Sequence, residues 1–429
     1  MEPKKQALNK KSSSSTRARS IQSLDSDLLC KIFSLVDPFD LARCSTVCKF
    51  WHNVINTSNI LKVLYYKQQH GSMHHSNLSA RPETSLQKHL ESLAMEQHKL
   101  SLQKGFVSVD QWKGHAAGVE QCRMKMGLIL TGVGDKVMRI WSSESYKCLE
   151  EYPVPDKFPL VDFDFDESKI VGLIGTRICI WRRHGGRSIF PSREGTFTNG
   201  LCMRYIDPEA VVGCEDGTVR VFDMYSRNCS RIIRTRAGSV MCLALTDQLI
   251  LGGSSLGSIT VASLSSGDCV ASLKATYSTG SIWSLCFNPR SHLVFSGSSA
   301  GYSHCWDLRT MRPLWEKRVS PNVVYSLQHQ ANDTSVLIVG GIDGVLRTLD
   351  QNTGEILASY VLHEGNRATS SENRYGVIER KKAIRLSEDT LIDSVPKNMR
   401  PPISCLAVGM KKVVTTHSGK LIRMWRFNK

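Results

Sequence analysis

A repeated pattern of short β-strands between residues 105 and 429 constrains the fold of this 429-residue chain more than any other feature. Each unit contains a strand that ends near an aromatic or apolar residue, and these ends are 40 to 44 residues apart as far as Leu349. The last interval is 76 residues, which equals one unit plus an insertion of about 33 residues. The seven strand ends are Trp141, Trp181, Phe222, Ala262, Trp306, Leu349 and Trp425.

The residues within each unit explain why the units must stack. Apolar and polar residues alternate, as in Val219-Arg220-Val221, which is typical of half-buried strands. Gly and Asp occupy tight turns, as at Asp216-Gly217. Such a unit buries its faces only against its neighbours, so the set requires a closed ring. We expect Gly105 to Trp112 to supply the outer strand of the last unit, because nothing after Trp425 is long enough.

Units with this period and these turns resemble those of WD-repeat β-propellers. The resemblance implies seven blades of four short strands each. The first unit matches the family's full buried hydrogen-bond set, which comprises His115, Thr131, Asp135 and Trp141. Only Asp216 and Asp343 recur at the Asp position, so we expect most blades to be held together by apolar packing.

The segment from Ile21 to Ile55 predicts a group of short helices. Apolar residues recur near helical spacing from Leu24 to Val36, and Asp37-Pro38 suits the start of a new helix. About 35 residues cannot bury this many apolar side chains alone. We therefore expect the segment to dock on a partner protein.

This helical segment resembles an F-box, the module that binds the Skp-type adaptor of cullin-RING ubiquitin ligases. The matching positions are Leu24, Leu28, Ile32-Phe33-Ser34, Leu35, Pro38-Phe39-Asp40-Leu41 and Val47-Cys48-Lys49-Phe50-Trp51. Asp25 departs from the family, which has Pro there and thus a fixed φ at the helix entry. The resemblance implies that ten residues bind the adaptor, namely Leu24, Leu28, Ile32, Phe33, Leu35, Pro38, Leu41, Val47, Cys48 and Trp51.

The predicted organisation has four parts. Residues 1–20 form a basic tail that we expect to be disordered, residues 21–56 the F-box, residues 57–104 a helical linker that ends at Gly105, and residues 105–429 the propeller. The insertion, at about residues 362–401, is polar, and we expect it to project from the ring as a functional or disordered loop. The predicted fold is therefore mainly β, with a seven-bladed WD-repeat β-propeller preceded by a small all-α F-box and a helical linker.

Composition excludes several classes of protein. The net charge is +16, but the basic residues outside the tail are spread thinly, whereas nucleic-acid binding favours a clustered basic face. No run of about 20 apolar residues and no secretory signal is visible, so we expect no membrane span and a cytoplasmic or nuclear location. The fourteen cysteines contain no C-x-x-C pair, which favours small buried hydrophobic residues over disulfides or a zinc site.

No catalytic, metal or cofactor signature is present. We find no nucleophile motif in a recognisable context and no phosphate-binding Gly-rich loop before a helix. Asp162, Asp164 and Asp166 alternate along a strand, and we interpret them as a solvated strand face rather than a metal site. We therefore expect a non-enzymatic protein without a cofactor.

In the propeller family, the narrow top face of the ring often binds peptides. Alignment of the units places two rings of residues there. The first is Glu120, Val161, Asn199, Met241, Trp283, Tyr325 and Ser404, and the second is Gly134, Ile174, Glu215, Ser255, Ser299, Ile342 and Ser418. Relatives that capture phosphorylated degrons place arginines at these positions, but this chain places none, and a phosphate buried without Arg or Lys is unfavourable.

Met241, Trp283 and Tyr325 are contiguous in this ring and are typical anchors for apolar peptide groups. The alternative is that Trp283 covers the end of a degenerate blade. The candidate substrate-binding residues are Glu120, Asn199, Met241, Trp283, Tyr325 and Ser404.

The sequence thus predicts a substrate receptor of a ubiquitin ligase. A WD-repeat scaffold outside a ligase and, less favoured, a nucleic-acid-associated propeller are the alternatives.

Overall fold

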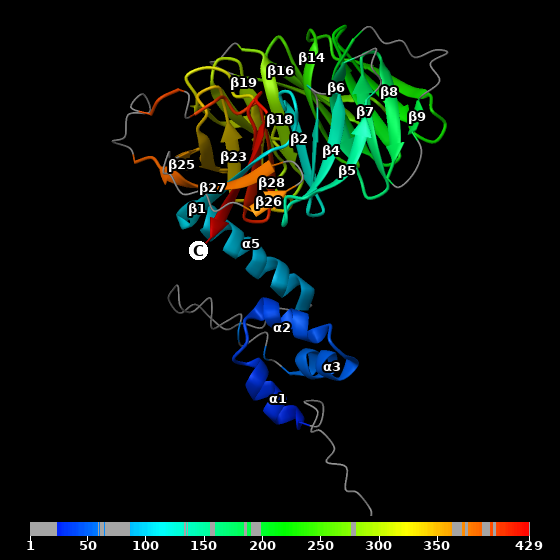
Figure 1. Cartoon of the computed structure of the whole chain (residues 1–429). Coiled ribbons are helices and arrows are strands. Elements are labelled where there is room, and N and C mark those ends of the chain that lie inside the picture. Colours follow the sequence, from blue (N-terminus) through cyan, green and yellow to red (C-terminus); the bar gives the residue numbers. More distant parts are fainter. Residues whose placement is uncertain are drawn as a thin grey trace, which may run out of the picture. The chain divides into compact units, whose positions relative to one another are not determined.

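The computed structural model divides the chain into two compact units, Met1–Gln97 and His98–Lys429, and many of their elements are labelled in Figure 1. The structure describes residues 24–58, 60, 64, 86–132, 134, 136–154, 159–183, 187–189, 199–275, 280–362, 371–373, 376–387, 395–397 and 400–428. The predicted basic tail, most of the region between residues 59 and 85, and Asp135 lie outside the described residues.

The first unit is helical, with α1 (Ser26–Phe33), α2 (Pro38–Ser45), α3 (Lys49–Thr57) and the start of α5 (Leu86–Lys104). The predicted helix start at Asp37-Pro38 is confirmed, because Pro38 is the first residue of α2 and the Phe39 N–H donates to the Asp37 carboxylate at 2.7 Å. Cys48 caps α3, where its sulfur accepts from the Trp51 N–H at 3.5 Å.

Five side chains form the small core of this helical unit, namely Leu29, Phe33, Leu41, Val54 and Ile55. The Trp51 ring lies edge-on against the Phe33 ring, with a centroid separation of 5.3 Å. The expectation that the segment cannot bury all of its apolar residues is confirmed, since several large apolar side chains of α1 and its neighbouring turns stay exposed.

Helix α5 ends at Lys104, immediately before Gly105, as predicted. Its last residues belong to the second unit, and His98 is buried there. The Lys411 N–H donates to His98 Nδ1 at 2.9 Å, so the ring carries its proton on Nε2, which faces the Asp333 carboxylate at 3.6 Å. Burial lowers the pKa of His98, although the negative charge of Asp333 acts in the opposite direction. These contacts fix the C-terminal turns of α5 within the second unit.

The described residues of the second unit form five separate four-stranded antiparallel sheets. In order from the first strand to the fourth, they are β2 (Gln121–Lys125), β3 (Leu128–Gly132), β4 (Val137–Ser142), β5 (Cys148–Pro153); β6 (Leu160–Phe165), β7 (Lys169–Ile174), β8 (Arg177–Arg182), β9 (Arg187–Ile189); β10 (Gly200–Ile206), β11 (Glu209–Cys214), β12 (Thr218–Asp223), β13 (Cys229–Arg234); β14 (Val240–Leu245), β15 (Leu249–Ser254), β16 (Ser258–Ser263), β17 (Cys269–Lys274); and β18 (Ile282–Asn288), β19 (Leu293–Ser298), β20 (Tyr302–Asp307), β21 (Arg312–Arg318).

A sixth, ten-stranded sheet has the order β22-β23-β24-β25-β27-β1-β30-β29-β28, with β26 paired to β27. Its strands are β1 (Phe106–Lys113), β22 (Ser326–Gln328), β23 (Val336–Gly340), β24 (Leu346–Asp350), β25 (Ile356–Leu362), β26 (Ser371–Asn373), β27 (Gly376–Arg385), β28 (Cys405–Gly409), β29 (Lys412–Thr416) and β30 (Leu421–Asn428). All seven strand ends predicted from the repeat period lie in strands, each the third from the inner edge of its group.

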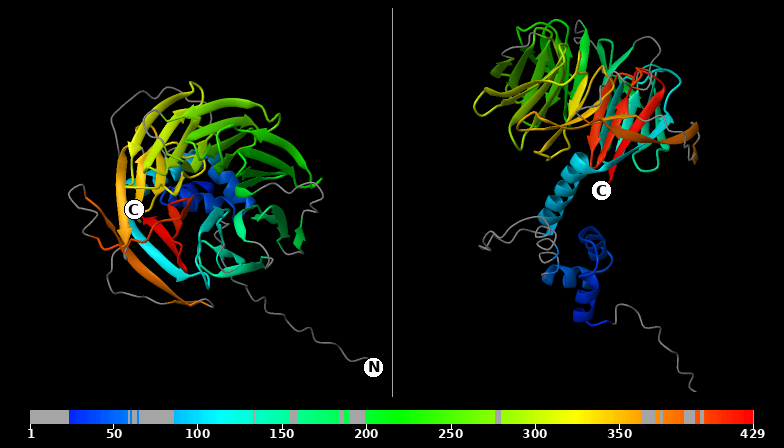
Figure 2. Two further views of the ribbon diagram at one scale, coloured as in Figure 1. Left: turned by 90° about the horizontal axis from the view of Figure 1, so that it is seen from above. Right: turned by 90° about the vertical axis from the view of Figure 1, so that its left-hand side faces the viewer.

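The predicted closing strand is confirmed. Strand β1 pairs antiparallel with β30 along its whole length, from Phe106↔Asn428 to Lys113↔Leu421. The chain thus joins its first strand to its last one, which makes the arrangement of sheets propeller-like and nearly closed. The left panel of Figure 2 looks along the axis around which the sheets are arranged.

The cores lie between neighbouring sheets, as the repeat pattern requires. One cluster joins Val221 of β12 to Ile250 of β15, and another joins Trp141 of β4 to Val414 of β29. The second cluster packs the first sheet against the last strands of the chain. Apolar contact therefore supports the closure that the β1–β30 hydrogen bonds make.

The polar insertion was expected to project as a loop, and this expectation is wrong for residues 376–385. These residues form β27, which pairs with β25 through Tyr360↔Arg385 and with β1 through Ser108↔Lys382. The outer edges of β25 and β1 can each pair with a further strand, and β27 pairs with both. Its apolar residues Ile378 and Ala383 pack against the adjoining cores, so the strand is held by side chains as well as by its backbone.

A buried carboxylate fixes this added strand. Asp110 of β1 accepts from the Tyr146 hydroxyl at 2.7 Å and from Arg380 Nε of β27 at 2.9 Å. Arg426 of β30 lies 3.4 Å from the same carboxylate. Strands β27, β1 and β30 are therefore joined by ionic contacts at one point.

The hydrogen-bond set predicted for the first unit is present in its described members. Arg139 donates to His115 Nδ1 at 2.7 Å, so His115 Nε2 donates to Thr131 Oγ1 at 2.8 Å, and the Trp141 indole donates to the same oxygen. The last unit has a similar arrangement that was not predicted from the sequence. There the Trp425 indole donates to Thr415 Oγ1, which lies 2.8 Å from His417 Nε2.

Candidate functional site

The helical unit exposes large apolar side chains on α1, on the turns that follow the first two helices and at the start of α3. Leu28, Ile32 and Leu35 are 50%, 43% and 88% exposed, and Val47 and Phe50 are also exposed. Leu28 and Ile32 are four residues apart on one helix and therefore share a face. We call this set, Leu28, Ile32, Leu35, Val47 and Phe50, the apolar face. Exposed aliphatic and aromatic side chains in this number are typical of a protein-docking surface.

The ten predicted adaptor-binding residues occupy different environments. Leu28, Ile32, Leu35 and Val47 belong to the apolar face, whereas Leu24, Cys48 and Trp51 are half-buried. Phe33, Pro38 and Leu41 are buried in the helical unit itself. These last three residues are core residues that support the exposed surface. Phe50 was not among the predicted contacts, although its place between Lys49 and Trp51 of the F-box pattern was a usable signal.

The second unit contains a cavity of about 1120 Å³ along its axis. The first strands of the five separate sheets line it together with β22 and β28. Four of the predicted substrate-binding residues lie in its wall, namely Met241, Trp283, Tyr325 and Ser404. Glu120 and Asn199 do not line it. Asn199 is exposed and donates to the Glu215 carboxylate at 3.1 Å.

A β-bulge recurs near the start of an inner strand in four of the described sheets. The ladder shifts register at Val161 in β6, Leu201 in β10, Met241 in β14 and Trp283 in β18. Leu201, Met241 and Trp283 line the cavity, whereas Val161 does not. The prediction placed Asn199 in this ring where the structure places Leu201. Strands β14 and β18 begin with the apolar residues Val240 and Ile282, but β10 begins with Gly200. The first apolar position of β10 is therefore not recognisable in the sequence.

Trp283 and Tyr325 form an aromatic pair in the cavity wall. Their ring centroids are 6.0 Å apart with an interplanar angle of 90°, which is a favourable edge-to-face geometry. Trp283 remains 41% exposed. Because this indole faces open space and lines the cavity, it is available to a ligand as well as to its own sheet.

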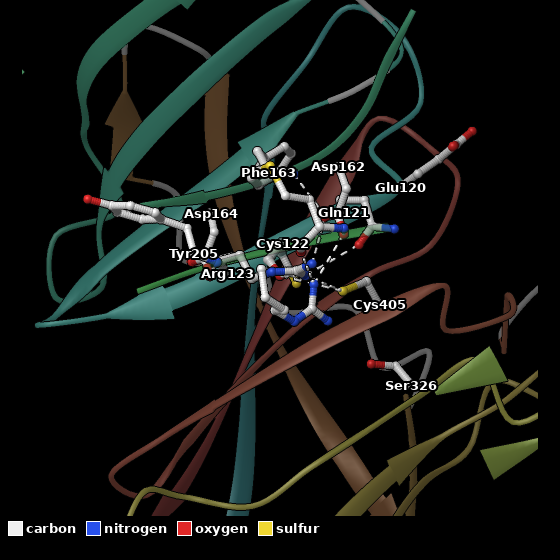
Figure 3. A network of polar contacts seen from close by, with 12 residues as sticks. Glu120, Gln121, Cys122, Arg123, Asp162, Phe163, Asp164, Tyr205, Ser326 and Cys405 are labelled. Carbon is white, nitrogen blue, oxygen red and sulfur yellow. Dashed lines mark hydrogen bonds and ion pairs between the residues drawn. The ribbon is translucent and has the colours of Figure 1, made fainter. Parts of the chain in front are cut away.

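Buried ion pairs connect the inner strands of the first three sheets (Figure 3). Arg123 of β2 donates to the Asp162 carboxylate of β6 at 2.7 Å, and Arg204 of β10 donates to its other oxygen at 3.1 Å. Lys125 lies 2.6 Å from the Asp164 carboxylate. Burial alone raises the pKa of Asp164, but the charges of Lys125 and Arg123 outweigh it and hold this pKa below its ordinary value.

The interpretation of these aspartates as a solvated strand face is therefore wrong for Asp162 and Asp164, which are buried and ion-paired. Asp166 instead accepts from the Ser168 N–H at its turn. A signal for the pairs was present in the sequence, because Arg123 precedes Asp162 by 39 residues and Lys125 precedes Asp164 by the same interval. This interval is one repeat, so opposite charges fall on adjacent strands.

These pairs also bear on anion binding. Arg123, Arg204 and Lys125 line the cavity, but all three face the carboxylates of Asp162 or Asp164. A bound phosphate would have to compete with them.

Among the described residues, no group of three or more His, Cys, Asp or Glu side chains is suited to hold a metal ion. No helix in the described ranges has the length and apolar character needed to span a membrane.

Comparisons with known proteins agree with both parts of the chain. The F-box domain family matches residues 21–63, and the family described as WD domain, G-beta repeat matches residues 267–307. The second match begins at the outer strand β17 and continues through β20, so a sequence repeat here runs from the outer strand of one sheet into the next. The chain is 52% identical to an F-box/WD-40 repeat-containing protein of Arabidopsis thaliana over 431 residues, which cover 95% of each chain.

Proposed function

Because this chain belongs to the family of F-box/WD-40 repeat-containing proteins, we propose that it is the substrate-recognition subunit of an SCF-type ubiquitin ligase complex. The F-box binds a Skp-type adaptor and through it a cullin-RING core, and the propeller binds the protein to be ubiquitinated. One observation carries the proposal, namely that the F-box exposes the apolar face of Leu28, Ile32 and Leu35 in a chain that also contains a propeller-like unit with an open cavity.

In this proposal the chain supplies position rather than chemistry. Holding a target next to a ubiquitin-charged enzyme makes the transfer effectively intramolecular and raises the local concentration of the reacting lysine. The subunit itself is not an enzyme and needs no cofactor. We expect it to act in the cytoplasm, the nucleus or both.

We further infer that the ring has seven blades. Five are the separate four-stranded sheets, and the ten-stranded sheet supplies two more. One of these is β22 to β25, and the other is β28 to β30 with β1 as its fourth strand. Strand β27 then joins the outer strands of these two blades. The regular repeat period of the sequence supports the same count.

The substrate site in this proposal is the mouth of the axial cavity. The aromatic pair of Trp283 and Tyr325, with Met241 and Leu201 on neighbouring strands, offers apolar area to a peptide, and Ser404 adds a hydroxyl. Glu120 and Asn199 lie outside the cavity wall and would contact only the outer part of a bound protein. Since the cavity arginines already face Asp162, we expect recognition that does not depend on phosphate.

Replacing Trp283 by alanine should weaken target capture by about tenfold or more, because a partly exposed Trp at a binding site is a typical hot spot worth about 2 kcal/mol. Adaptor binding should not change, since Trp283 belongs to the second unit. The measurement is quantitative mass spectrometry of proteins that co-purify with the full chain while the proteasome is inhibited.

Tyr225→Ala is the matched control, because Tyr225 is an exposed aromatic residue that does not line the cavity. It should leave the set of captured proteins unchanged. Phosphatase treatment of the lysate should leave capture by the wild-type chain unchanged as well. An identical set of captured proteins with Trp283→Ala, or loss of capture after phosphatase, would contradict the proposed site.

A further inference from the structure

Five of the cysteines line the axial cavity, each on an inner strand, namely Cys122, Cys202, Cys242, Cys286 and Cys405. Two of them belong to the sheets that meet where the ring closes. Cys122 lies on β2 of the first sheet and Cys405 on β28 at the end of the last one. Cys405 Sγ donates to the Cys122 carbonyl oxygen at 3.5 Å, so the two cysteines lie side by side on adjacent inner strands. This pair is far apart in the sequence and adjacent in space.

A cation stands beside this pair of thiols (Figure 3). Arg123 Nη1 donates to Cys405 Sγ at 3.7 Å, while Nη2 of the same guanidinium donates to Asp162. When Cys405 ionises, its sulfur can accept from both the Cys122 thiol and Arg123. The Asp162 carboxylate opposes this ionisation but is more closely associated with the two arginines.

These contacts separate Cys405 from the other cavity cysteines. The hydrogen bond from Cys122 and the charge of Arg123 lower the pKa of Cys405 to about 6, although burial acts in the opposite direction. The pKa of Cys122 is raised, because its thiol donates to Cys405 and is buried. Burial also raises the pKa values of Cys202, Cys242 and Cys286. Among these five cysteines, Cys405 is therefore the one whose surroundings favour the thiolate.

We propose that Cys122 and Cys405 form a peroxide-sensitive pair that closes to a disulfide between β2 and β28. Three observations support it: Arg123 donates to Cys405 Sγ, Cys405 Sγ contacts the backbone of Cys122, and both residues belong to the cavity wall. The proposal concerns the closure of the ring and does not depend on the ligase function.

The chemistry balances with a hydroperoxide as the oxidant. The Cys405 thiolate attacks one peroxide oxygen, an S–O bond forms, and the O–O bond breaks to release an alkoxide, or hydroxide from hydrogen peroxide, which takes up a proton. The Cys122 thiol then loses its proton, and its sulfur attacks the sulfenic sulfur of Cys405. The S–O bond breaks, and the leaving hydroxide takes up the proton as water. Two thiols and one hydroperoxide thus give one disulfide, one alcohol or water, and one further water.

The bond would have a defined structural effect. It would covalently join the first sheet to the last one at their inner strands, next to Ser404 in the cavity wall. It would also remove the negative sulfur that faces Arg123. Oxidation would therefore lock the closure of the ring and change the charge of the cavity that we propose as the substrate site.

The test is to treat the reduced full-length chain with hydrogen peroxide at pH 7, alkylate the remaining thiols and analyse tryptic peptides by mass spectrometry. The peptides that contain Cys122 and Cys405 hold no other cysteine, so a cross-link between them is unambiguous. We expect this cross-linked peptide to form and to disappear with dithiothreitol. The exposed Cys269 should remain mostly alkylatable.

Two further measurements assign the roles. The alkylation rate of Cys405 should rise with a midpoint near pH 6, and Cys122→Ser should stop oxidation at a Cys405 sulfenic acid that dimedone traps. Cys269→Ser should leave the cross-link unchanged. The absence of a Cys122–Cys405 cross-link in the wild-type chain, with Cys405 no more readily oxidised than Cys269, would overturn the proposal whether or not the variants fold.

Discussion

Joint replacement of Leu28, Ile32 and Leu35 by alanine is expected to weaken binding of the Skp-type adaptor by at least about a thousandfold. All three side chains are more than 40% exposed in the isolated chain, so their truncation removes docking contacts without opening a cavity in the helical core. Central apolar contacts of an interface are worth about 2 kcal/mol each, and a thousandfold change corresponds to about 4 kcal/mol. Calorimetric titration of purified adaptor into the full chain measures the change.

Two controls separate docking from folding. Leu256→Ala removes an equally exposed leucine from the second unit and should leave the affinity for the adaptor unchanged. Leu41→Ala removes a fully buried core residue and should destabilise the helical unit by about 2–5 kcal/mol. Wild-type affinity in the triple variant would show that the apolar face is not the adaptor site.

Asp162→Ala is expected to destabilise the second unit by about 3–5 kcal/mol, because it leaves Arg123 and Arg204 without the carboxylate that both contact. It also removes the acceptor of the Met203 N–H at 2.9 Å. Urea unfolding followed by tryptophan fluorescence should show a lower midpoint. Asp162→Asn keeps the shape of the side chain and should have an intermediate effect.

Asp268→Ala is the matched control, since Asp268 is an exposed aspartate in a turn of the same unit. Its effect should lie within about 0.5 kcal/mol of zero, as for most surface substitutions. Equal effects of Asp162→Ala and Asp268→Ala would contradict the role assigned to the buried ion pairs.

The features that the sequence predicted well are those with a short-range signal. The alternating pattern around Val219-Arg220-Val221 and the spacing from Trp141 to Leu349 identify strands because side-chain direction has a period of two. The closing strand at Gly105 to Trp112 followed from counting strands in the last unit. The start of α2 followed from the chemistry of Asp37 and Pro38 alone.

The features that were missed depend on pairing between distant residues. Strand β27 contains the charged run from Glu379 to Lys382, which looks like loop composition, and its place is set by the edges of β25 and β1. Leu201, Met241 and Trp283 of the cavity wall lie at β-bulges, which re-aim single side chains and leave no mark in the periodicity. For example, the prediction placed Asn199 in the ring, whereas the structure places Leu201 there.

The contact between Cys122 and Cys405 could not be predicted for a similar reason. The fourteen cysteines are free in the structure, and no spacing in the sequence links Cys122 to Cys405. Their proximity appears only when the first and last sheets meet. Ring closure thus creates local chemistry that neither strand carries by itself.

The central claim is that the propeller captures proteins and that the ligase complex bound by the F-box ubiquitinates them. The most direct measurement compares the wild-type chain with the Leu28, Ile32 and Leu35 triple variant in proteasome-inhibited cells, quantifying captured proteins and the ubiquitin remnants on them. We predict that both chains capture the same proteins and that only the wild-type chain brings adaptor, cullin and ubiquitin to them. Equal ubiquitination of the captured proteins with both chains, or a wild-type chain that purifies without adaptor and cullin, would contradict the account and favour a scaffold outside a ligase.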